Sequence, residues 1–366
     1  MKKILAMLLV VCSLLCACAP AEETPTTTEA TTEATTEATT QATTEATTEA
    51  TGASQLYRNP LNGAPMDAAY AGRPVAVVVN NIKQALPQRG ISKADFFYEF
   101  ETEGGITRCL AVFSDITQVA DVGPVRSART YFNNIAQSYD AVIAHCGGSV
   151  RGRNAGYEDS DNKIKNWAHI DQMGNGSYFF RDKDRRKNGY SLEHTLFSTG
   201  KNLMAAMENR KIAGATDRST DFGLVFEDQV VLNGEAATKI EIKFRGSKKT
   251  NLTYDTASGK YFLEEYGKKW VDENDKSQLS AKNVLILCTD QWSRKEASYS
   301  RSYYELEGEG TGYLAIDGKL VAIKWSRKDL TSHFVYTLQD GSPVTLAVGN
   351  TYVAVVGDNK TPAKYS

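Results

Sequence analysis

The chain has 366 residues, of which 41% are hydrophobic and 23% charged, and its formal net charge at pH 7 is −2. The first 54 residues hold seven Glu and two Lys, so residues 55–366 carry 37 acidic and 40 basic side chains, a formal charge of +3. A body this close to neutral lacks the strongly basic face of most nucleic-acid-binding proteins, and we expect no nucleic-acid partner. The three cysteines after residue 18 are too few and too scattered for a disulfide framework, and none has metal-binding spacing.

Residues 1–18 have the pattern of a lipoprotein signal peptide. Two lysines precede an apolar run over residues 4–15, which is shorter than the about 20 residues of a membrane-spanning helix. The string LCAC at 15–18 resembles a bacterial lipobox, with small Ala17 before the expected cleavage point and Cys18 as the residue to be diacylated. The alternative is an ordinary secreted protein. We expect a diacylglyceryl anchor on Cys18 that holds the protein at the extracytoplasmic face of the cell membrane.

Residues 19–54 are predicted to be a disordered tether. They contain six consecutive four-residue units, TTEA five times and TTQA once, and no large apolar residue. Such a segment cannot bury enough surface to offset the entropy lost on ordering. Its root-mean-square span would be on the order of 30 Å, and its threonines are candidates for O-glycosylation. The tether would therefore hold the folded body away from the membrane.

Residues 55–215 are predicted to form an N-terminal α/β domain. The apolar run over 74–79 is typical of a central strand. Two further strands, over 95–102 and 106–113, flank the sequence Glu-Gly-Gly at 103–105 and predict a β-hairpin.

A helix and a fourth strand follow this hairpin. Gly123-Pro124 presets a helix start, apolar residues then recur at helical spacing to Tyr139, and residues 141–144 are an apolar strand. With the strand at 106–113 these elements predict a βαβ crossover, which would place the two strands in parallel and both following loops at one edge of the sheet.

That edge is the predicted ligand site. Arg126 and Arg129 lie three apart in the first turn of the predicted helix, beside backbone N–H groups that no helical carbonyl can satisfy, and this combination favours an anion. Ligands collect at the carboxyl ends of parallel strands, so Ser127, His145 and Ser149 are expected to converge with the arginines. The planar guanidinium fork suits phosphate or carboxylate.

Structural ion pairs are the alternative to an anion site. Arg126 and Arg129 could pair internally with Glu99 and Glu103. The two glutamates could instead supply acid and base for glycan hydrolysis, which needs two carboxylates at a defined separation. Pairing with Arg108 or Arg129 is the favoured interpretation of these carboxylates.

The candidates for a catalytic role are His145, Ser149 and His194. His145 ends an apolar strand, where it could be an ordinary buried histidine, a donor to an anion or a general base, and it could pair with His194. Ser149 lacks the Gly-x-Ser-x-Gly elbow of serine hydrolases, and Gly147 and Gly148 more readily let the backbone approach a ligand. No histidine spacing indicates a metal site.

The rest of the chain is predicted to begin with a long polar loop over 151–190 and a helix capped by Ser198 or Thr199. A domain boundary falls between 214 and 223, and residues 216–366 are β-rich. In this part we expect a half-buried strand over 240–244, a buried strand over 284–287, hairpins turning at Asp317-Gly318 and Asp340-Gly341, and a last strand over 352–356.

Several of these motifs together resemble the YerB-like lipoproteins of Gram-positive bacteria, the DUF3048 family. The resemblance spans nearly everything after residue 60, and the string GPVRSAR at 123–129 is its most specific part. It implies a surface lipoprotein with an N-terminal and a C-terminal module, and it implies no reaction. The other matching segments are Asn81, PQ-x-G at 87–90, Ala94-Asp95, Glu99, EGGITR at 103–108, H-x-GGS at 145–149, FRD at 180–182, the segment around His194, and the C-terminal Tyr254-Asp255, Asn283-Val284, Asp317-Gly318 and Trp325.

The sequence thus predicts an α+β protein, with a mixed N-terminal sheet containing a βαβ unit and a mostly-β C-terminal domain. Its expected function is to bind an anionic cell-wall polymer or envelope protein, without a cofactor; the alternative is an envelope hydrolase or transferase acting on phosphate-bearing or glycan polymers. The candidate ligand-binding residues are Asn81, Glu99, Glu103, Arg108, Arg126, Ser127, Arg129, His145, Gly147, Gly148, Ser149 and Arg181.

Overall fold

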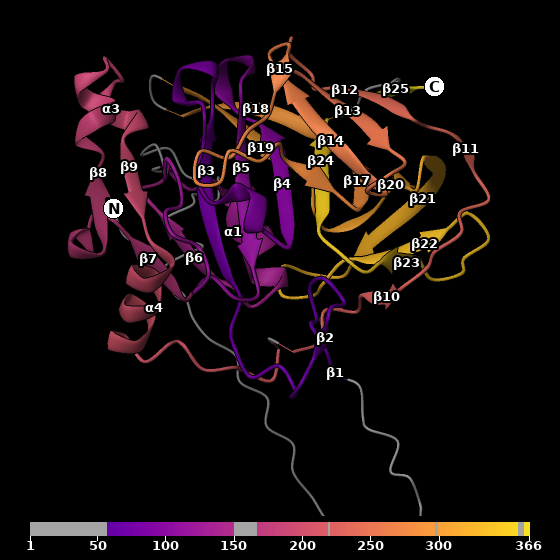
Figure 1. Ribbon diagram of the computed structural model, residues 1–366, viewed down its shortest axis with the longest axis horizontal. Coiled ribbons are helices and arrows are strands. Elements are labelled where there is room, and N and C mark those ends of the chain that lie inside the picture. Colours follow the sequence, from indigo (N-terminus) through magenta and orange to yellow (C-terminus); the bar gives the residue numbers. More distant parts are fainter. Residues whose placement is uncertain (1–56, 150–166, 219, 297–298, 358–361) are drawn as a thin grey trace, which may run out of the picture. The chain divides into compact units, whose positions relative to one another are not determined.

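The computed structural model describes residues 57–149, 167–218, 220–296, 299–357 and 362–366 (Figure 1). Residues Ser54–Ser366 form one compact unit. The predicted signal peptide, lipobox and tether lie outside the described residues. Within the described part of the chain, no helix is both long and apolar enough to cross a membrane.

A large mixed sheet of 11 strands runs through this unit. Both faces of its central strands are buried, which explains the continuous apolar runs at residues 74–79 and 284–287. In spatial order its strands are β11 (Glu235–Ala236), β21 (Lys319–Arg327), β20 (Gly308–Ile316), β17 (Asn283–Cys288), β24 (Thr351–Val356), β4 (Phe96–Glu101), β5 (Thr107–Phe113), β3 (Val75–Asn81), β6 (Val142–His145) and β7 (His169–Asp171), with β22 (Val335–Leu338) beside β21.

A second sheet of six strands packs on one face of the large sheet. Alternation of apolar and charged residues in β12 turns Ile240 and Ile242 inward and the lysines outward, as the sequence predicted. Ile240, Leu252 and Leu263 share a core with Val77 and Ala111 of the large sheet. The strands are β15 (Lys268–Lys269), β14 (Lys260–Glu265), β13 (Lys249–Asp255), β12 (Lys239–Lys243) and β25 (Ala363–Tyr365), with β16 (Ser280–Ala281) beside β14.

The opposite face of the large sheet is covered by α1 (Thr130–Ser138), whose Phe132 and Ile135 pack into a core with Tyr98 and Phe100. Smaller elements complete the structure. They are the strand pairs β1 (Tyr57–Arg58) with β2 (Pro65–Met66), β8 (Phe179–Arg181) with β9 (Leu196–Ser198), β10 (Val225–Glu227) with β23 (Thr345–Ala347) and β18 (Gln291–Glu296) with β19 (Tyr299–Tyr304), the helices α3 (Lys183–Lys187) and α4 (Gly200–Asn209), and the 3-10 turns η1 (Lys83–Ala85), η2 (Ile91–Lys93), η3 (Glu103–Gly105), η4 (Gly176–Tyr178) and η5 (Leu192–His194).

Elements that depend on local turn chemistry match the predictions. β4 and β5 form the predicted hairpin around η3. β20 and β21 turn at Asp317 and Gly318, whose φ angles of 48° and 74° are those of a type I′ turn. The side chain of Thr199 accepts a hydrogen bond from the Asn202 amide and so caps α4.

The predicted βαβ unit is wrong. β6 pairs in parallel with β3, while β5 pairs antiparallel with both β3 and β4, so β5 and β6 run in opposite directions. The helix also starts later than predicted, at Thr130. The residues just before the helix are extended and hydrogen-bond to β3 instead. The backbone amide of Arg126 donates to the carbonyl of Val78, and Val125 forms an antiparallel β-bridge with Val79.

The predicted last strand is instead central to the large sheet. β24 lies between β17 and β4, parallel to both, and β25 follows it in the other sheet. The large sheet therefore crosses the predicted boundary at residues 215 and 216, and the division of the chain there stays a prediction. The whole fold is mostly β, and the predicted loop over 151–190 includes the short elements β7, β8 and α3.

A buried ion cluster joins the two sheets. Lys248, just before β13, places its Nζ 3.2 Å from Glu99 Oε1 in β4 and 3.0 Å from Glu265 Oε2 in β14, and all three side chains are at most 2% exposed. Thr250 and Tyr352 donate hydrogen bonds to the second oxygen of Glu99. We refer to Glu99, Lys248 and Glu265 as the ion cluster.

We predict that Lys248→Met lowers the free energy of unfolding by about 3–5 kcal/mol, because it leaves two buried carboxylates without their cation. Lys249→Met is the matched control, since its exposed pair with Glu241 should contribute about 1 kcal/mol or less. Urea unfolding measures both, and equal losses for the two variants would contradict a structural role for the ion cluster.

A second prediction concerns Glu265, whose pKa is raised to about 7, mainly by burial. Between pH 4.5, the usual pKa of a glutamate, and about pH 7, Glu265 keeps its proton in the folded protein but loses it in the unfolded chain. The proton therefore stabilises the folded state at low pH, and this contribution is lost as pH rises. The stability of Glu265→Gln relative to wild type should therefore increase from pH 5 to pH 8, by on the order of 2 kcal/mol. The control Glu264→Gln should show no comparable trend; a flat difference for Glu265→Gln would refute the prediction.

Candidate functional site

Three parallel strands end at one edge of the large sheet. β3 ends with Asn80 and Asn81, β6 with His145 and β7 with Asp171. We call this region, with the loops that meet it, the carboxyl edge, and ligands of open sheets collect at such edges. The sequence predicted that β5 and β6 end here together, but β5 runs the opposite way, and β3 and β7 are the strands that end beside β6.

The two predicted site loops meet at the carboxyl edge. Residues 122–129 run back along β3, and the Ala128 amide donates to the carbonyl of Gly147 over 3.0 Å. The Cys146 amide donates to the carbonyl of Arg126, and Ser127 Oγ donates to the carbonyl of Cys146 over 2.8 Å. These bonds hold both loops in one backbone framework.

Arg129 takes part in an internal ion pair. Its Nε and Nη2 donate to the two carboxylate oxygens of Glu103 over 2.9 and 3.1 Å, and its side chain is 7% exposed. Burial would raise the pKa of Glu103, but its hydrogen bond and charge interaction with Arg129 outweigh burial and lower that pKa. Arg129 is the N-cap residue of α1 and not part of its first turn, so the expected pair of arginines in a helical turn does not form.

Glu99 and Asn81 do not face a site. Glu99 is fully buried and pairs with Lys248, not with an arginine as predicted. Asn81, also fully buried, donates to Glu99 and Thr107 and accepts from Gln88. Both residues lie inside the polar contact between the sheets and bond to groups there, so we assign neither of them to the proposed site.

Arg108 and Arg126 carry the remaining positive charge. Arg108 is 5% exposed and donates to the carbonyl of Ser127 over 2.7 Å, and within the described residues it makes no salt bridge. Burial, followed by the nearby charges of Arg129 and Arg126, lowers the pKa of Arg108 to about 9. Arg126 pairs with Glu193 over 3.0 Å, and its buried Nε has no hydrogen-bond partner among the described residues.

The two candidate histidines have different partners. His145 is buried, with Nδ1 2.8 Å from the carbonyl of Gly147 and Nε2 3.1 Å from Nδ1 of His169. His194 instead lies with its Nδ1 3.0 Å from the side-chain amide of Asn80. Each of these two histidines thus has a partner of its own, and a joint role for them stays a prediction. Burial and the neighbouring His145 lower the pKa of His169 to about 4.

The remaining predicted residues surround this edge. Ser149 is buried at 3% exposure, and Gly147 adopts a left-handed φ of 64° while its amide donates to Asp171. Arg181 donates to the carbonyl of Leu192. Burial raises the pKa of the Cys146 thiol, while the charges of Arg181 and Arg126 lower it. In the described parts of the chain, no group of three or more His, Cys, Asp or Glu side chains could hold a metal ion.

Comparisons with known proteins agree with this architecture. Residues 61–213 match the model of the DUF3048 N-terminal domain, a protein of unknown function, and residues 240–353 match that of the DUF3048 C-terminal domain. The chain belongs to the DUF3048 family. It is 28% identical over 295 residues to the "Putative lipoprotein YerB" of Bacillus subtilis strain 168, covering 78% of this chain and 82% of that protein. The crystal structure of YerB from Bacillus subtilis matches with a TM-score of 0.69 at 25% identity, over 84% of this chain and 99% of that one.

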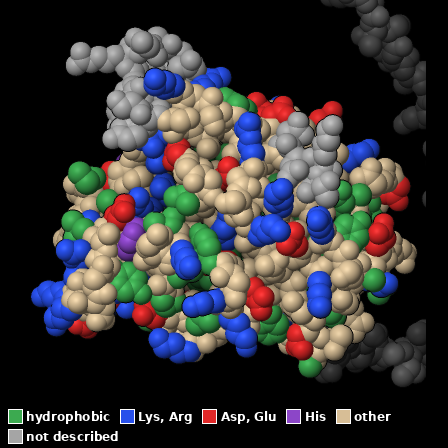
Figure 2. Space-filling model, turned by 90° about the horizontal axis from the view of Figure 1, so that it is seen from above, with side chains coloured by type: hydrophobic (Ala, Val, Ile, Leu, Met, Phe, Trp, Pro, Cys, Tyr) green, Lys and Arg blue, Asp and Glu red, His purple; other side chains and the backbone are tan. Residues whose placement is uncertain are grey.

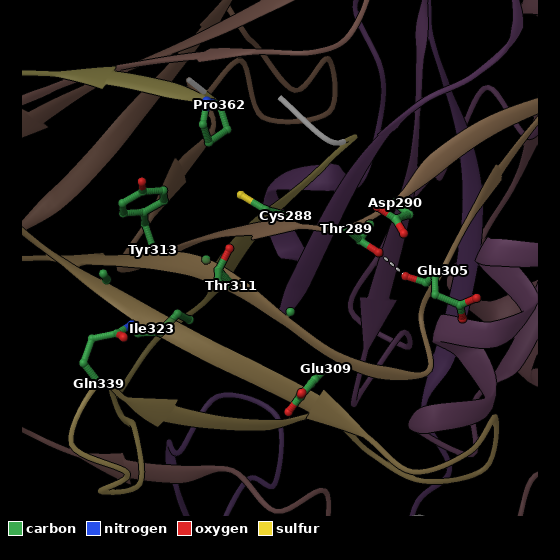
Figure 3. A pocket seen from close by; sticks show the side chains of 13 residues that line it. Cys288, Thr289, Asp290, Glu305, Glu309, Thr311, Tyr313, Ile323, Gln339 and Pro362 are labelled. Atoms are coloured by element: carbon green, nitrogen blue, oxygen red, sulfur yellow. Dashed lines mark hydrogen bonds between the residues drawn. The ribbon is translucent and has the colours of Figure 1, made fainter. Parts of the chain in front are cut away.

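Sequence reasoning missed two features of this DUF3048 protein. His169 and Lys248 carry no local signal, since His169 lies in a polar stretch and Lys248 stands beside the exposed Lys249. A pocket of about 580 Å³ lies away from the predicted residues, between β17, β20 and β21, where Cys288, Thr311 and Tyr313 line it (Figure 3). None of the predicted ligand-binding residues lines this pocket.

We predict that the ring of His169 stays neutral down to about pH 4, so the protein loses stability as pH falls from about 6.5, where the unfolded chain takes up this proton. NMR titration of the histidine rings measures this pKa. In His145→Asn the repulsion from His145 is removed, and the pKa of His169 should rise while burial keeps it below 6.5. A His169 ring that titrates near pH 6.5 in the wild type would contradict the geometry.

Proposed function

We propose that this protein is a lipid-anchored, extracytoplasmic binding protein that holds an anionic envelope ligand at the carboxyl edge through Arg126 and Arg108. The anchoring part of the proposal rests on the signal-peptide pattern, on the lipobox that ends in Cys18, and on the similarity to the protein named "Putative lipoprotein YerB". The tether of residues 19–54 would then carry the folded unit away from the membrane.

An excess of positive charge at the carboxyl edge supports the binding part. Arg108, Arg126 and Arg129 lie close enough for the other two to lower the pKa of Arg108. Two carboxylates pair with these arginines: Glu103, which accepts from Nε and Nη2 of Arg129, and Glu193, which pairs with Arg126. A buried cation without a salt bridge is costly, and an anion would offset that cost. The charge of Arg108, which makes no salt bridge within the described residues, is the observation that carries this proposal.

Arg126 is the residue we expect to exchange partners. Its pair with Glu193 is accessible, with side chains 25% and 50% exposed, so the pair contributes little to stability. A ligand anion could displace the Glu193 carboxylate and take its place at the Nη2 of Arg126. Phosphate and carboxylate both fit the planar fork of arginine, so the ligand class includes phosphate-bearing wall polymers and acidic segments of envelope proteins.

Binding rather than catalysis is proposed because the candidate catalytic groups are held by internal contacts. Both ring nitrogens of His145 lie at hydrogen-bond distance from Gly147 and His169, and Nδ1 of His194 is engaged by Asn80. A general base needs a free nitrogen within reach of the proton that it removes. The role that we propose for the arginines is therefore to bind the negative charge of the ligand, not to assist a reaction.

The test is the binding of phosphodiester polymer fragments to residues 54–366, measured by calorimetry and thermal stability at two salt concentrations. A ligand at about 100 times its dissociation constant should add roughly 2.7 kcal/mol of stability, and the affinity should fall with salt. Arg126→Gln should weaken binding about tenfold or more, whereas Glu193→Gln should strengthen it by removing the competing carboxylate. Arg58→Gln, which removes an exposed charge paired with Asp228, is the control.

Opposite signs for Arg126→Gln and Glu193→Gln would be hard to obtain from a merely structural ion pair, because both changes would then act only on stability. Binding that is independent of salt, or equal in Arg126→Gln and Arg58→Gln, would refute the anion site. Failure of every fragment, with Glu193→Gln no tighter than wild type, would redirect the search to another surface.

A further inference from the structure

A second pocket, separate from the carboxyl edge, lies where the two sheets meet. Its volume is about 270 Å³, and it opens between the turn that follows β3 and the end of β14 with β15. One wall is formed by Leu86 and Pro87, and the other by Tyr266, Trp270 and Val271. The walls are mainly apolar, and the volume suits a molecule the size of one sugar ring.

The pocket borders the buried ion cluster through Glu265. This side chain lines the pocket, is 1% exposed, and gives its Oε2 to Lys248. Its Oε1 has no hydrogen-bond partner among the described residues. A buried carboxylate oxygen without a donor is costly. Above about pH 7, where Glu265 is ionised, a hydroxyl or amine of a ligand in the pocket could supply that donor.

The rim of the pocket is cationic. Lys83, Lys268 and Lys269 are exposed and line its mouth, and among the described residues Glu265 is the one acidic side chain that lines the pocket. β15 lies at the top of the molecule in Figure 1, and Lys and Arg side chains are spread over the face seen from above in Figure 2. Three ammonium groups around one mouth favour a ligand that also bears a negative charge.

The two aromatic side chains of the pocket, Tyr266 and Trp270, are held in place by contacts with the protein interior. The ammonium of Lys248 lies 4.8 Å from the ring centre of Tyr266 and 5.4 Å from that of Trp270, and the Trp270 indole donates to Gln88 over 2.9 Å. The Tyr266 hydroxyl donates to the carbonyl of Asn81. The walls are thus positioned before any ligand arrives, which reduces the entropy lost on binding.

From these contacts we infer that the pocket binds an anionic monosaccharide unit, with the ring between the apolar walls, a hydroxyl or amine donating to Glu265 Oε1, and the anionic group at Lys83, Lys268 and Lys269. The shared chemistry is one sugar ring with one phosphate or carboxylate. Free sugar phosphates and the end units of an envelope polymer both have it. This site does not depend on the arginines of the carboxyl edge.

The experiment uses residues 54–366 labelled with ¹⁵N on the indole nitrogens and titrated with glucose 6-phosphate, glucuronate, glucose and inorganic phosphate, each alone. Trp270 is the reporter, assigned with Trp270→Phe, and Trp325, which lies away from the pocket and donates to the carbonyl of Cys288, is the internal reference. We expect both anionic sugars to shift the Trp270 indole signal saturably, glucose to bind at least tenfold more weakly, and phosphate alone to leave the signal unchanged.

Two variants test separately the contribution of the rim lysines and that of Glu265 to binding. Lys268→Ala/Lys269→Ala should weaken the anionic sugars at least tenfold and leave glucose unchanged, while the control Lys239→Ala/Lys260→Ala removes equal charge from the same sheet and should have no effect. Glu265→Gln should weaken the anionic sugars and glucose alike, with urea unfolding showing that it is folded. Arg126→Gln should bind these sugars as wild type does, which separates this result from the anion site at the carboxyl edge.

Three outcomes would overturn the inference. The first is no saturable shift of Trp270 with either anionic sugar. The second is an equal response to inorganic phosphate, which would indicate only a cationic surface. The third is the same loss of binding in the rim variant and in its charge-matched control.

Discussion

The ion cluster of Glu99, Lys248 and Glu265 is the contact on which the arrangement of the two sheets depends. Two carboxylates from different sheets share one ammonium, with all three side chains withdrawn from water. Attraction between buried charges offsets desolvation only when geometry and additional hydrogen bonds are good, and Thr107, Thr250 and Tyr352 provide those bonds to Glu99. Any other placement of the six-stranded sheet would leave buried charge unpaired, so the cluster favours one register between the sheets.

This constraint shapes both proposed binding sites. The turn after β3 connects the carboxyl edge to the pocket at β14 and β15, and Asn81, at the end of β3, donates to Glu99 of the ion cluster. A second polar network supports the same contact, since Arg89 and Arg185 from the N-terminal part both bond to Glu273. The ion cluster and the bonds to Glu273 thus position both the arginines of the carboxyl edge and the lysines of the pocket rim. They hold the walls of each site in place without a ligand.

The sequence predicted what local chemistry determines and failed where distant segments decide. The hairpins at residues 103–105 and 317–318 follow from turn residues that need particular φ angles. The start of α1 was placed five residues too early, because the extended segment before it bonds to β3 and β9, which the periodicity of the helix cannot reveal. The central position of β24 and the bond between Glu99 and Thr250, 151 positions apart, arise from tertiary packing alone. Of the predicted site, the meeting of the two loops was correct, whereas Glu99 and Asn81 proved to be interior residues.

The binding of an anion at the carboxyl edge can be tested by soaking a crystal of residues 54–366 in selenate. Selenium gives an anomalous signal, and selenate is a tetrahedral anion that resembles phosphate. We predict an anomalous peak within hydrogen-bond distance of Arg126 and Arg108, with the Glu193 carboxylate displaced from Arg126. An intact Arg126–Glu193 pair at 3.0 Å, with no peak beside either arginine at saturating selenate, would contradict it.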